Sequence, residues 1–279
     1  MRSAEPPAVA RFAVSPFAAL VWTLAQRDLT TRFKGTVLGW MWSLIVPLAS
    51  LGLYSLVFGI IFRAEVEPMG NGHQPVYAIW LFIGLIAFTF FSNGLMRGAE
   101  ALRGLAGVLN RVRLPILAPV LAGLISVGVQ GLVELGLYLA VLAAFLNVGW
   151  SWLLLPLWAA LFFVFTAGIA AVVAVLSAHL EDILQFFAVL LQFLFFATPI
   201  MYPLTMVPAG LGGEFVDVRA LLGASPLAEF VTMARTLLYD LRPGELGQWL
   251  ALAAFAATSA VAGGLTLKYL GADVAERLQ

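Results

Sequence analysis

The chain has 279 residues, of which 62% are hydrophobic and 11% charged, and its formal net charge is zero. A soluble domain is about 45–50% apolar and about 25% charged, so this composition argues against a soluble enzyme and against a disordered chain. It is typical of a polytopic helical membrane protein, and the absence of cysteine excludes disulfides, iron–sulfur clusters and thiol catalysis.

The N-terminal segment 1–35 contains one amphipathic pattern, over residues 16–34. Polar side chains share one face and apolar ones spread over the other, namely Thr23, Gln26, Arg27, Thr30 and Lys34 against Phe17, Val21, Trp22, Ala25, Leu29 and Phe33. This pattern predicts a helix lying flat in the headgroup region. An ordinary surface helix packed on a bundle fits it equally well.

Six apolar segments follow, each long enough to cross about 30 Å of hydrocarbon, which takes roughly 20 helical residues. They are Thr36–Phe62, Val76–Met96, Leu114–Leu146, Leu153–Ala178, Ile183–Gly213 and Leu246–Leu267. The sequence therefore predicts an all-α, six-helix transmembrane bundle over residues 36–267, followed by a tail over 268–279, as a single domain.

The positive charges are distributed unequally between the two sides of these spans. Eleven of the 15 Lys and Arg residues fall before the first span, after the second or in the tail, and the other four are Arg63, Arg219, Arg235 and Arg242. The positive-inside rule predicts both termini in the cytoplasm.

Two segments do not fit a simple crossing. In the loop 97–114, an apolar stripe of Leu102, Leu105, Leu109 and Val112 predicts a short amphipathic helix for a soluble partner, with a plain surface loop as the alternative. In the stretch 198–248, Pro199, Pro203 and Pro208 interrupt the apolar run, and Ser225-Pro226 predicts the start of a helix up to Tyr239. That helix is too short to span, so we expect a re-entrant segment beside a pathway, or else an external surface loop.

Candidate functional side chains within the spans are few. Glu134 is the only carboxylate in an unbroken span, and we expect it to face the bundle interior near Gln130, although an intramembrane acid is also a candidate functional site. Gln185 and Gln192 fit interhelical contacts or pore lining. The many aromatic side chains in the spans could stack on sugar rings where they face a lumen. No GxxxxGK[ST] phosphate loop occurs, so we expect no nucleotide hydrolysis by this chain.

Three motifs resemble those of the permeases of polysaccharide-exporting ABC transporters, the group that exports O-antigen and teichoic acid. They are the run from Arg27-Asp28-Leu29 through Arg32 and Gly39 to Trp42-Ser43-Leu44 and Pro47-Leu48, then Asn110 to Pro115, and last Thr198 to Pro203 with Ser225-Pro226-Leu227. The order and spacing match over nearly the whole chain. This chain departs from the family pattern at two positions. The family often has Asn where this chain has Ser225, and it usually has Arg-Asp where this chain has Glu181-Asp182.

The resemblance implies a non-enzymatic transport subunit of the cytoplasmic, or inner, membrane that forms a homodimer with a channel between the copies. It implies two separate ATP-binding subunits, which hold ATP and Mg²⁺ while this chain binds no cofactor or metal, and a lipid-linked polysaccharide as cargo within the membrane lipids, with no nucleic acid. The residues it assigns are as follows: for coupling, Arg97, Glu100, Arg103, Asn110, Arg111 and Arg113; for the interface helix, Arg27, Asp28, Arg32 and Lys34; for the channel, Gly39, Trp42, Ser43, Tyr54, Gln185, Gln192 and Phe196; for the external gate, Thr198, Pro199, Tyr202, Pro203 and Pro226.

Three other functions stay open at this point. A related ABC permease could export a drug or a lipid instead. An integral-membrane polyprenyl-sugar transferase needs acidic clusters for a metal diphosphate, and Glu181-Asp182 is the only adjacent acidic pair. A secondary carrier would be expected to show paired inverted halves, which the sequence lacks.

Overall fold

The computed structural model describes residues 15–32, 39–105, 115–180, 182–208, 217–271 and 273–274. Every regular element in these ranges is a helix, and five helical stretches are long and apolar enough to cross a membrane. The predicted all-helical membrane class is therefore confirmed. The five stretches are Trp42–Ile61, Tyr77–Arg103 (α3), Leu117–Ala144 (α5), Trp150–His179 and Leu246–Leu270 (α10).

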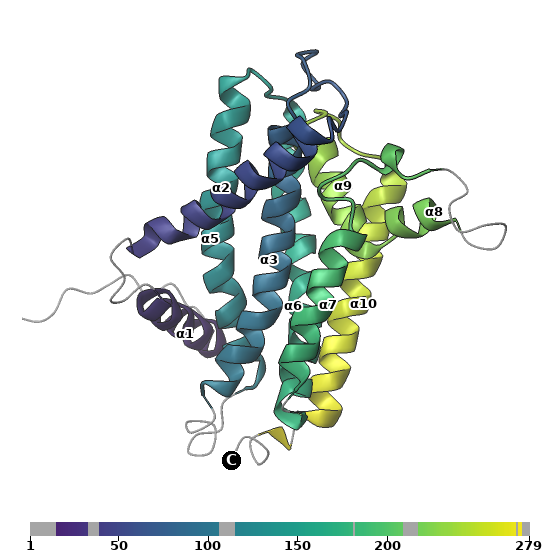
Figure 1. The fold of residues 1–279 in the computed structure, drawn as a ribbon. Coiled ribbons are helices and arrows are strands. Elements are labelled where there is room, and N and C mark those ends of the chain that lie inside the picture. The colour runs from purple at the N-terminus through teal and green to yellow at the C-terminus, as the bar shows by residue number, and fades with distance from the viewer. Residues whose placement is uncertain are drawn as a thin grey trace, which may run out of the picture.

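Helix α1 (Pro16–Arg32) lies across the bundle rather than along it and packs on α5 (Figure 1). Val21 and Ala25, one turn apart, are buried, whereas Phe17 and Trp22 are exposed. Packing of one apolar strip on α5 fits the alternative of a surface helix on the bundle, and the position in the headgroup region stays a prediction.

The first apolar stretch is irregular. It begins with the short 3-10 helix η1 (Gly39–Met41), where Gly39 has a φ of +49°, and continues through α2 (Trp42–Tyr54) into a π-helical segment η2 (Ser55–Ile61). Pro47 lies inside α2 and cannot donate the backbone hydrogen bond expected there. Ser43 and Pro47 are the only buried residues of α2, and η2 has none, so this helix lies at the edge of the bundle.

The core is formed by α3, α5, α10 and helix α6 (Leu155–His179), which follows the 3-10 turn η3 (Trp150–Leu154). Glycine allows close backbone contact at two crossings. A Cβ on Gly123 of α5 would lie 2.7 Å from the Arg97 carbonyl oxygen of α3, and one on Gly168 of α6 would lie 2.3 Å from the Ser259 carbonyl of α10. Small residues bring membrane helices together in this way because lipid supplies no hydrophobic drive between them.

The helix found at the predicted fifth crossing is shorter than the apolar segment Ile183–Gly213. Helix α7 (Ile183–Ala197) has 15 residues and ends at extended Thr198, before Pro199. Pro203 then precedes the 3-10 turn η4 (Leu204–Met206), and α8 (Val218–Gly223) follows further along the chain. A proline restricts the residue before it to extended backbone, which explains why α7 stops at this point although the sequence stays apolar.

Helix α9 (Pro226–Leu238) begins where the sequence predicts and ends one residue earlier. The Ser225 hydroxyl accepts a hydrogen bond from the Ala228 amide at 3.3 Å, and Pro226 occupies the first turn. Nine of its 13 residues are buried, and it packs against α3, α6 and α10 (Figure 1). Of the two predictions for this stretch, the description as an external surface loop does not fit α9.

Candidate functional site

A groove of about 530 Å³ lies between α2, α3, α5 and α7. We call it the polar groove, and its lining residues are Trp42, Ser43, Val46, Pro47, Ser50, Tyr54, Leu85, Phe88, Thr89, Ser92, Asn93, Gln130, Leu191, Gln192 and Phe195. None of these side chains is charged, whereas hydroxyls, amides and aromatic rings are all present. Such a surface can hydrogen-bond and stack on an uncharged polar ligand.

The aromatic side chains of the polar groove contact one another. The ring centroids of Phe195 and Phe88 are 4.9 Å apart, and those of Phe195 and Tyr54 are 5.5 Å apart. Phe195 therefore joins the α3 wall to the α2 wall through ring contacts that need no hydrogen bond. Contacts of this kind hold a shape without fixing a partner in one place.

Gln130 of α5 connects the polar groove to Glu134. Its side-chain nitrogen donates to a Glu134 carboxylate oxygen at 2.8 Å and to the Ser43 carbonyl at 3.3 Å. Pro47, four residues after Ser43, has no N–H to offer that carbonyl, so a side chain supplies a donor where the helix cannot. Glu134 is 2% exposed, and its side chain lies at the bundle interior beside Gln130.

The structure brings together only some of the residues that the sequence suggested for a channel. Trp42, Ser43, Tyr54 and Gln192 line the polar groove, but Gly39, Gln185 and Phe196 do not. Sequence reasoning missed the contribution of α3, namely Thr89, Ser92 and Asn93. Their three- and four-residue spacing places them on one helical face, which is a signal that could have identified them.

The C-terminal end of α3 carries the first three residues predicted to couple to an ATPase, namely Arg97, Glu100 and Arg103. Arg97 and Glu100 form an ion pair at 3.4 Å, and the Arg103 Nε donates to the Ser177 carbonyl at 3.1 Å, near the end of α6. These residues belong to the last turns of α3 rather than to a separate helix. Leu102 and Leu105 of the predicted stripe are buried in the bundle. Asn110, Arg111 and Arg113 lie outside the described residues.

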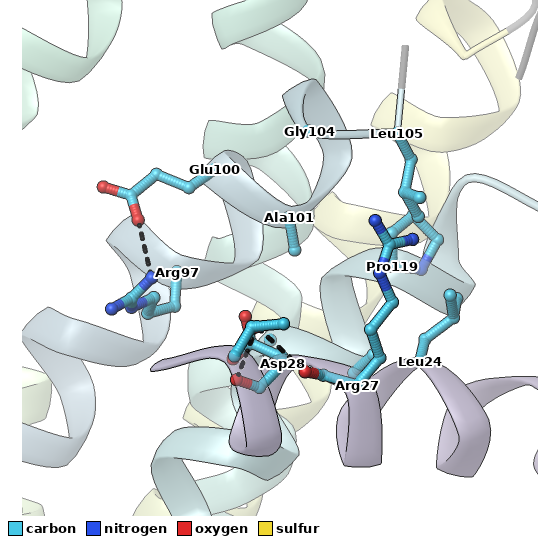
Figure 2. A pocket seen from close by; sticks show the side chains of 12 residues that line it. Leu24, Arg27, Asp28, Arg97, Glu100, Ala101, Gly104, Leu105 and Pro119 are labelled. Carbon is cyan, nitrogen blue, oxygen red and sulfur yellow. Dashed lines mark hydrogen bonds and ion pairs between the residues drawn. The ribbon is translucent and has the colours of Figure 1, made fainter. Parts of the chain in front are cut away.

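A second cavity, of about 370 Å³, lies where α1 crosses α3 and α5 (Figure 2). Arg27 and Asp28 of α1 line it together with Arg97 and Glu100 of α3. The Asp28 carboxylate accepts a hydrogen bond from the hydroxyl of Ser126 on α5, which fixes α1 to the bundle. Two predicted sets, the interface helix and the coupling residues, thus meet at one cavity. Lys34 and the side chain of Arg32 lie outside the described part.

Residues predicted for an external gate surround the break after α7. The Pro199 and Ile200 carbonyls accept hydrogen bonds from the Arg235 guanidinium at 2.8 and 2.7 Å, and Thr198 is buried. The Tyr202 hydroxyl donates to the Phe196 carbonyl at 2.8 Å. Pro203 precedes η4 and Pro226 opens α9. Sequence reasoning missed Arg235, which counted there only as an external positive charge.

Side chains from the α5–α6 connection hold the far end of α9. Asn147 donates to the Leu238 and Tyr239 carbonyls, both at 3.0 Å, and Ser151 donates to the Leu237 carbonyl at 2.6 Å. The last carbonyls of a helix have no partner within it, so these contacts satisfy them in a buried place. The C-terminal end of the short helix is therefore fixed inside the bundle.

No group of three His, Asp or Glu side chains that could hold a metal ion occurs within the described ranges. The sites above are instead built from uncharged polar groups, aromatic rings and a few ion pairs. Such groups can bind a ligand through stacking and hydrogen bonds.

Comparison with known proteins agrees with this picture. The chain is 28% identical over 244 residues, 84% of its length and 86% of the relative's, to an O-antigen export system permease protein RfbA of Myxococcus xanthus. It is 24% identical to a protein of the same name from Klebsiella pneumoniae, covering 68% of this chain and 71% of that one. It is 25% identical to the polysialic acid transport protein KpsM of Escherichia coli, covering 67% and 71%. Residues 19–212 match the ABC-2 type transporter family, and the chain is a multi-pass membrane protein that belongs to that family.

Proposed function

We propose that this chain is the membrane-spanning subunit of an ATP-driven exporter that moves a lipid-linked polysaccharide across the cytoplasmic membrane. The observation that carries the proposal is the polar groove, which offers hydroxyls, amides and aromatic rings and no charged side chain. The relatives named for O-antigen export and polysialic acid transport support a polysaccharide cargo. An uncharged, hydroxylated polymer needs stacking surfaces and weak polar contacts so that it can slide.

The proposal includes a second copy of the chain and two ATP-binding subunits, which would bind ATP and Mg²⁺. The end of the bundle that carries α1, Arg97 and Arg103 would face the cytoplasm and receive the ATP-binding subunits, with both chain termini on that side. The cavity between α1, α3 and α5 supports this placement, because movement of α3 there would be transmitted directly to α1. The exposed edge position of α2 supports a second copy closing the polar groove into a channel.

At the other end, α7 with the segment 198–203 would form the fifth of six crossings, and α9 would be a re-entrant gate near the exit. Burial of α9 and its capping by Asn147 and Ser151 support this role. Irregular backbone at membrane depth is tolerated where it is buried in protein or borders a wet cavity.

Co-expression with the ATP-binding subunit encoded beside it tests the proposal. We expect the two proteins to copurify, to hydrolyse ATP together and to restore surface polysaccharide in cells lacking both. A chain that copurifies with no such subunit would overturn the proposal.

A pair of tryptophan variants tests the groove separately. Ser50→Trp would place a bulky ring in the polar groove and should reduce export strongly, whereas Leu250→Trp, at an exposed position of α10 outside the groove, should not. Equal export by both variants would remove the polar groove from the transport path.

A further inference from the structure

Another groove, of about 460 Å³, lies between α5 and α6, and we call it the apolar groove. Both helices pack on α3, which contributes Ile86, Ala87 and Phe90 to the lining. Two glycines of α5, Gly128 and Gly131, leave the space open. A Cβ built on either one would have the Phe90 ring as its nearest neighbour outside α5, at 3.7 Å. The apolar groove is therefore present because α5 lacks the side chains that would fill it.

The walls of the apolar groove offer almost nothing that can bind a polar ligand. None of the described side chains that line it is charged, and their only polar atoms are the ring nitrogens of Trp22 and Trp158. The Trp158 nitrogen donates to the Phe230 carbonyl at 2.9 Å, so this N–H is already used. A hydrocarbon chain fits such a surface, since water would lack partners there and an empty crevice would lose dispersion contacts.

The position of the apolar groove indicates where this hydrocarbon comes from. On α5 the lining runs from Ile125 to Leu135, in the middle of a membrane-spanning helix, and Leu132 is exposed at its rim. Gly128 and Leu132 each lie two residues from Gln130, which at about 100° per residue places them on the opposite side of α5. Because Gln130 lines the polar groove, the apolar groove faces away from the proposed transport path and towards bilayer lipid.

Helix α1 borders one end of the apolar groove. Its Trp22 lines the groove and is 52% exposed. The hydrogen bond between Asp28 and Ser126 holds α1 against α5 at the level where the lining begins. Tryptophan is enriched at the boundary between headgroups and hydrocarbon, because its ring is apolar and its N–H is polar. A chain that enters beside Trp22 would leave its headgroup near α1 and place its tail between α5 and α6.

We infer that the apolar groove binds one acyl chain of a bilayer phospholipid, from the leaflet in which α1 lies. The bound chain contacts Trp22 of α1 and Phe162 of α6 at the same time, because both line the groove. It thereby stabilises the packing of α1 on the bundle. This lipid site is separate from the polar groove and does not depend on the identity of the cargo.

The test follows phospholipid that stays bound to the full chain. The protein is reconstituted in nanodiscs of phosphatidylethanolamine and phosphatidylglycerol that include a phosphatidylethanolamine with a diazirine in its acyl chain, and crosslinked peptides are identified by mass spectrometry. We expect a crosslink to Phe162, which is only 2% exposed and is therefore reached through the groove. After extraction into detergent, native mass spectrometry should show retained phospholipid, and its removal should lower the melting temperature.

Two pairs of variants make the test specific. Gly128→Leu places a side chain against Phe90 in the groove and should abolish both the retention and the Phe162 crosslink. Gly136→Leu, on the same helix but where a Cβ has no neighbour within 4 Å, should keep both. Trp22→Ala removes the exposed end wall and should reduce retention even if Gly128→Leu does not fold. Phe17→Ala, on α1 but outside the groove and 37% exposed, should behave like the wild type.

Three outcomes would overturn the inference. The first is a folded Gly128→Leu variant that retains phospholipid as the wild type does, and the second is a wild-type chain that retains none. The third is displacement of the phospholipid by undecaprenyl phosphate added to the nanodiscs, which would assign the groove to a polyprenyl carrier instead. None of these results bears on the proposed function, which is judged by copurification with the ATP-binding subunit and by export.

Discussion

The guanidinium of Arg235 lies over the ring of Trp80, with its central carbon 3.4 Å from the ring centroid. Its nitrogens also donate to the carbonyls of Pro199 and Ile200, where α7 ends, and to the carbonyl of Trp80 itself at 3.3 Å. One side chain of α9 thereby joins α3, α9 and the break after α7. A planar fork of donors above an aromatic face is a geometry that arginine provides and lysine does not.

Arg235→Lys should therefore destabilise the protein although it keeps the charge. A single ammonium cannot reach both carbonyls and stack on Trp80, so we expect a loss of about 2 kcal/mol or more in unfolding free energy, measured as thermal unfolding in detergent. Arg219→Lys on α8 is the matched control and should have little effect. Equal stability of the two variants would show that the Arg235 contacts contribute nothing measurable.

The sequence was sufficient to predict the class of fold and several boundaries. Composition and uninterrupted apolar runs indicated membrane helices, and Ser225-Pro226 marked the start of α9 because a cap and a first-turn proline act locally. It did not predict that α7 ends at Ala197, since residues 198–203 remain apolar and only the prolines signal the break. Nor could it place Arg235, because a charge count along the chain does not show that a short helix folds back into the bundle.

The candidate site was predicted in part for a similar reason. Trp42, Ser43 and Tyr54 were named from a resemblance, and they do share a groove, but Gln185 was grouped with Gln192 by residue type alone. The two glutamines lie seven residues, or about two turns, apart and so share a face of α7, but only Gln192 lies at the level of the groove. How far a groove extends along a helix depends on tertiary packing, which a single sequence does not reveal.

The crossing of α6 and α10 depends on the missing side chain of Gly168. A Cβ there would lie 2.3 Å from backbone atoms of Ser259, which cannot move without shifting α10. Gly168→Ala should cost about 1–3 kcal/mol in unfolding free energy through overpacking. Gly264→Ala on α10 is the control, because a Cβ there has no neighbour within 4 Å, and it should be neutral or slightly stabilising. Equal melting temperatures for both variants would contradict the close packing at Gly168.

Glu134 is predicted to act through its hydrogen bond rather than through its charge. Glu134→Gln keeps an oxygen that can accept from Gln130, so export should stay near the wild-type level. Glu134→Leu removes the acceptor, leaves a buried N–H of Gln130 unpaired and should cost about 1–3 kcal/mol in stability. Surface polysaccharide and thermal unfolding, measured at equal expression, distinguish the two. Loss of export by a well-expressed Glu134→Gln variant would instead give the carboxylate a role in transport.

Asp240 predicts a pH dependence of stability. Asp240 lies in the turn between α9 and α10, outside the spanning helices. Burial, and to a smaller extent the negative charge of the nearby Glu67, raises the pKa of its carboxyl from 3.8 to about 6, and the positive charges of Arg242 and Arg235 oppose this rise. Because the folded state binds this proton more tightly than the unfolded state, ionisation of Asp240 opposes folding. The contribution of Asp240 to the unfolding free energy is therefore least favourable above pH 6 and becomes more favourable as the pH falls from about 6 towards 4.

Asp240→Asn removes the ionisation. At pH 8 it should raise the unfolding free energy by an amount on the order of 1–2 kcal/mol, which is measured as a higher melting temperature. The gain should shrink between pH 6 and pH 4, since wild-type Asp240 is then protonated in the folded state. Asp217→Asn does not serve as a control, because Asp217 caps α8 through the Arg219 amide at 3.0 Å. Glu245→Gln has the same difficulty at the start of α10, where Glu245 takes part in a capping box. The control is therefore the wild-type protein at the same pH values. A stability difference between Asp240→Asn and the wild type that does not change with pH would show that Asp240 titrates in the folded state as it does in the unfolded chain.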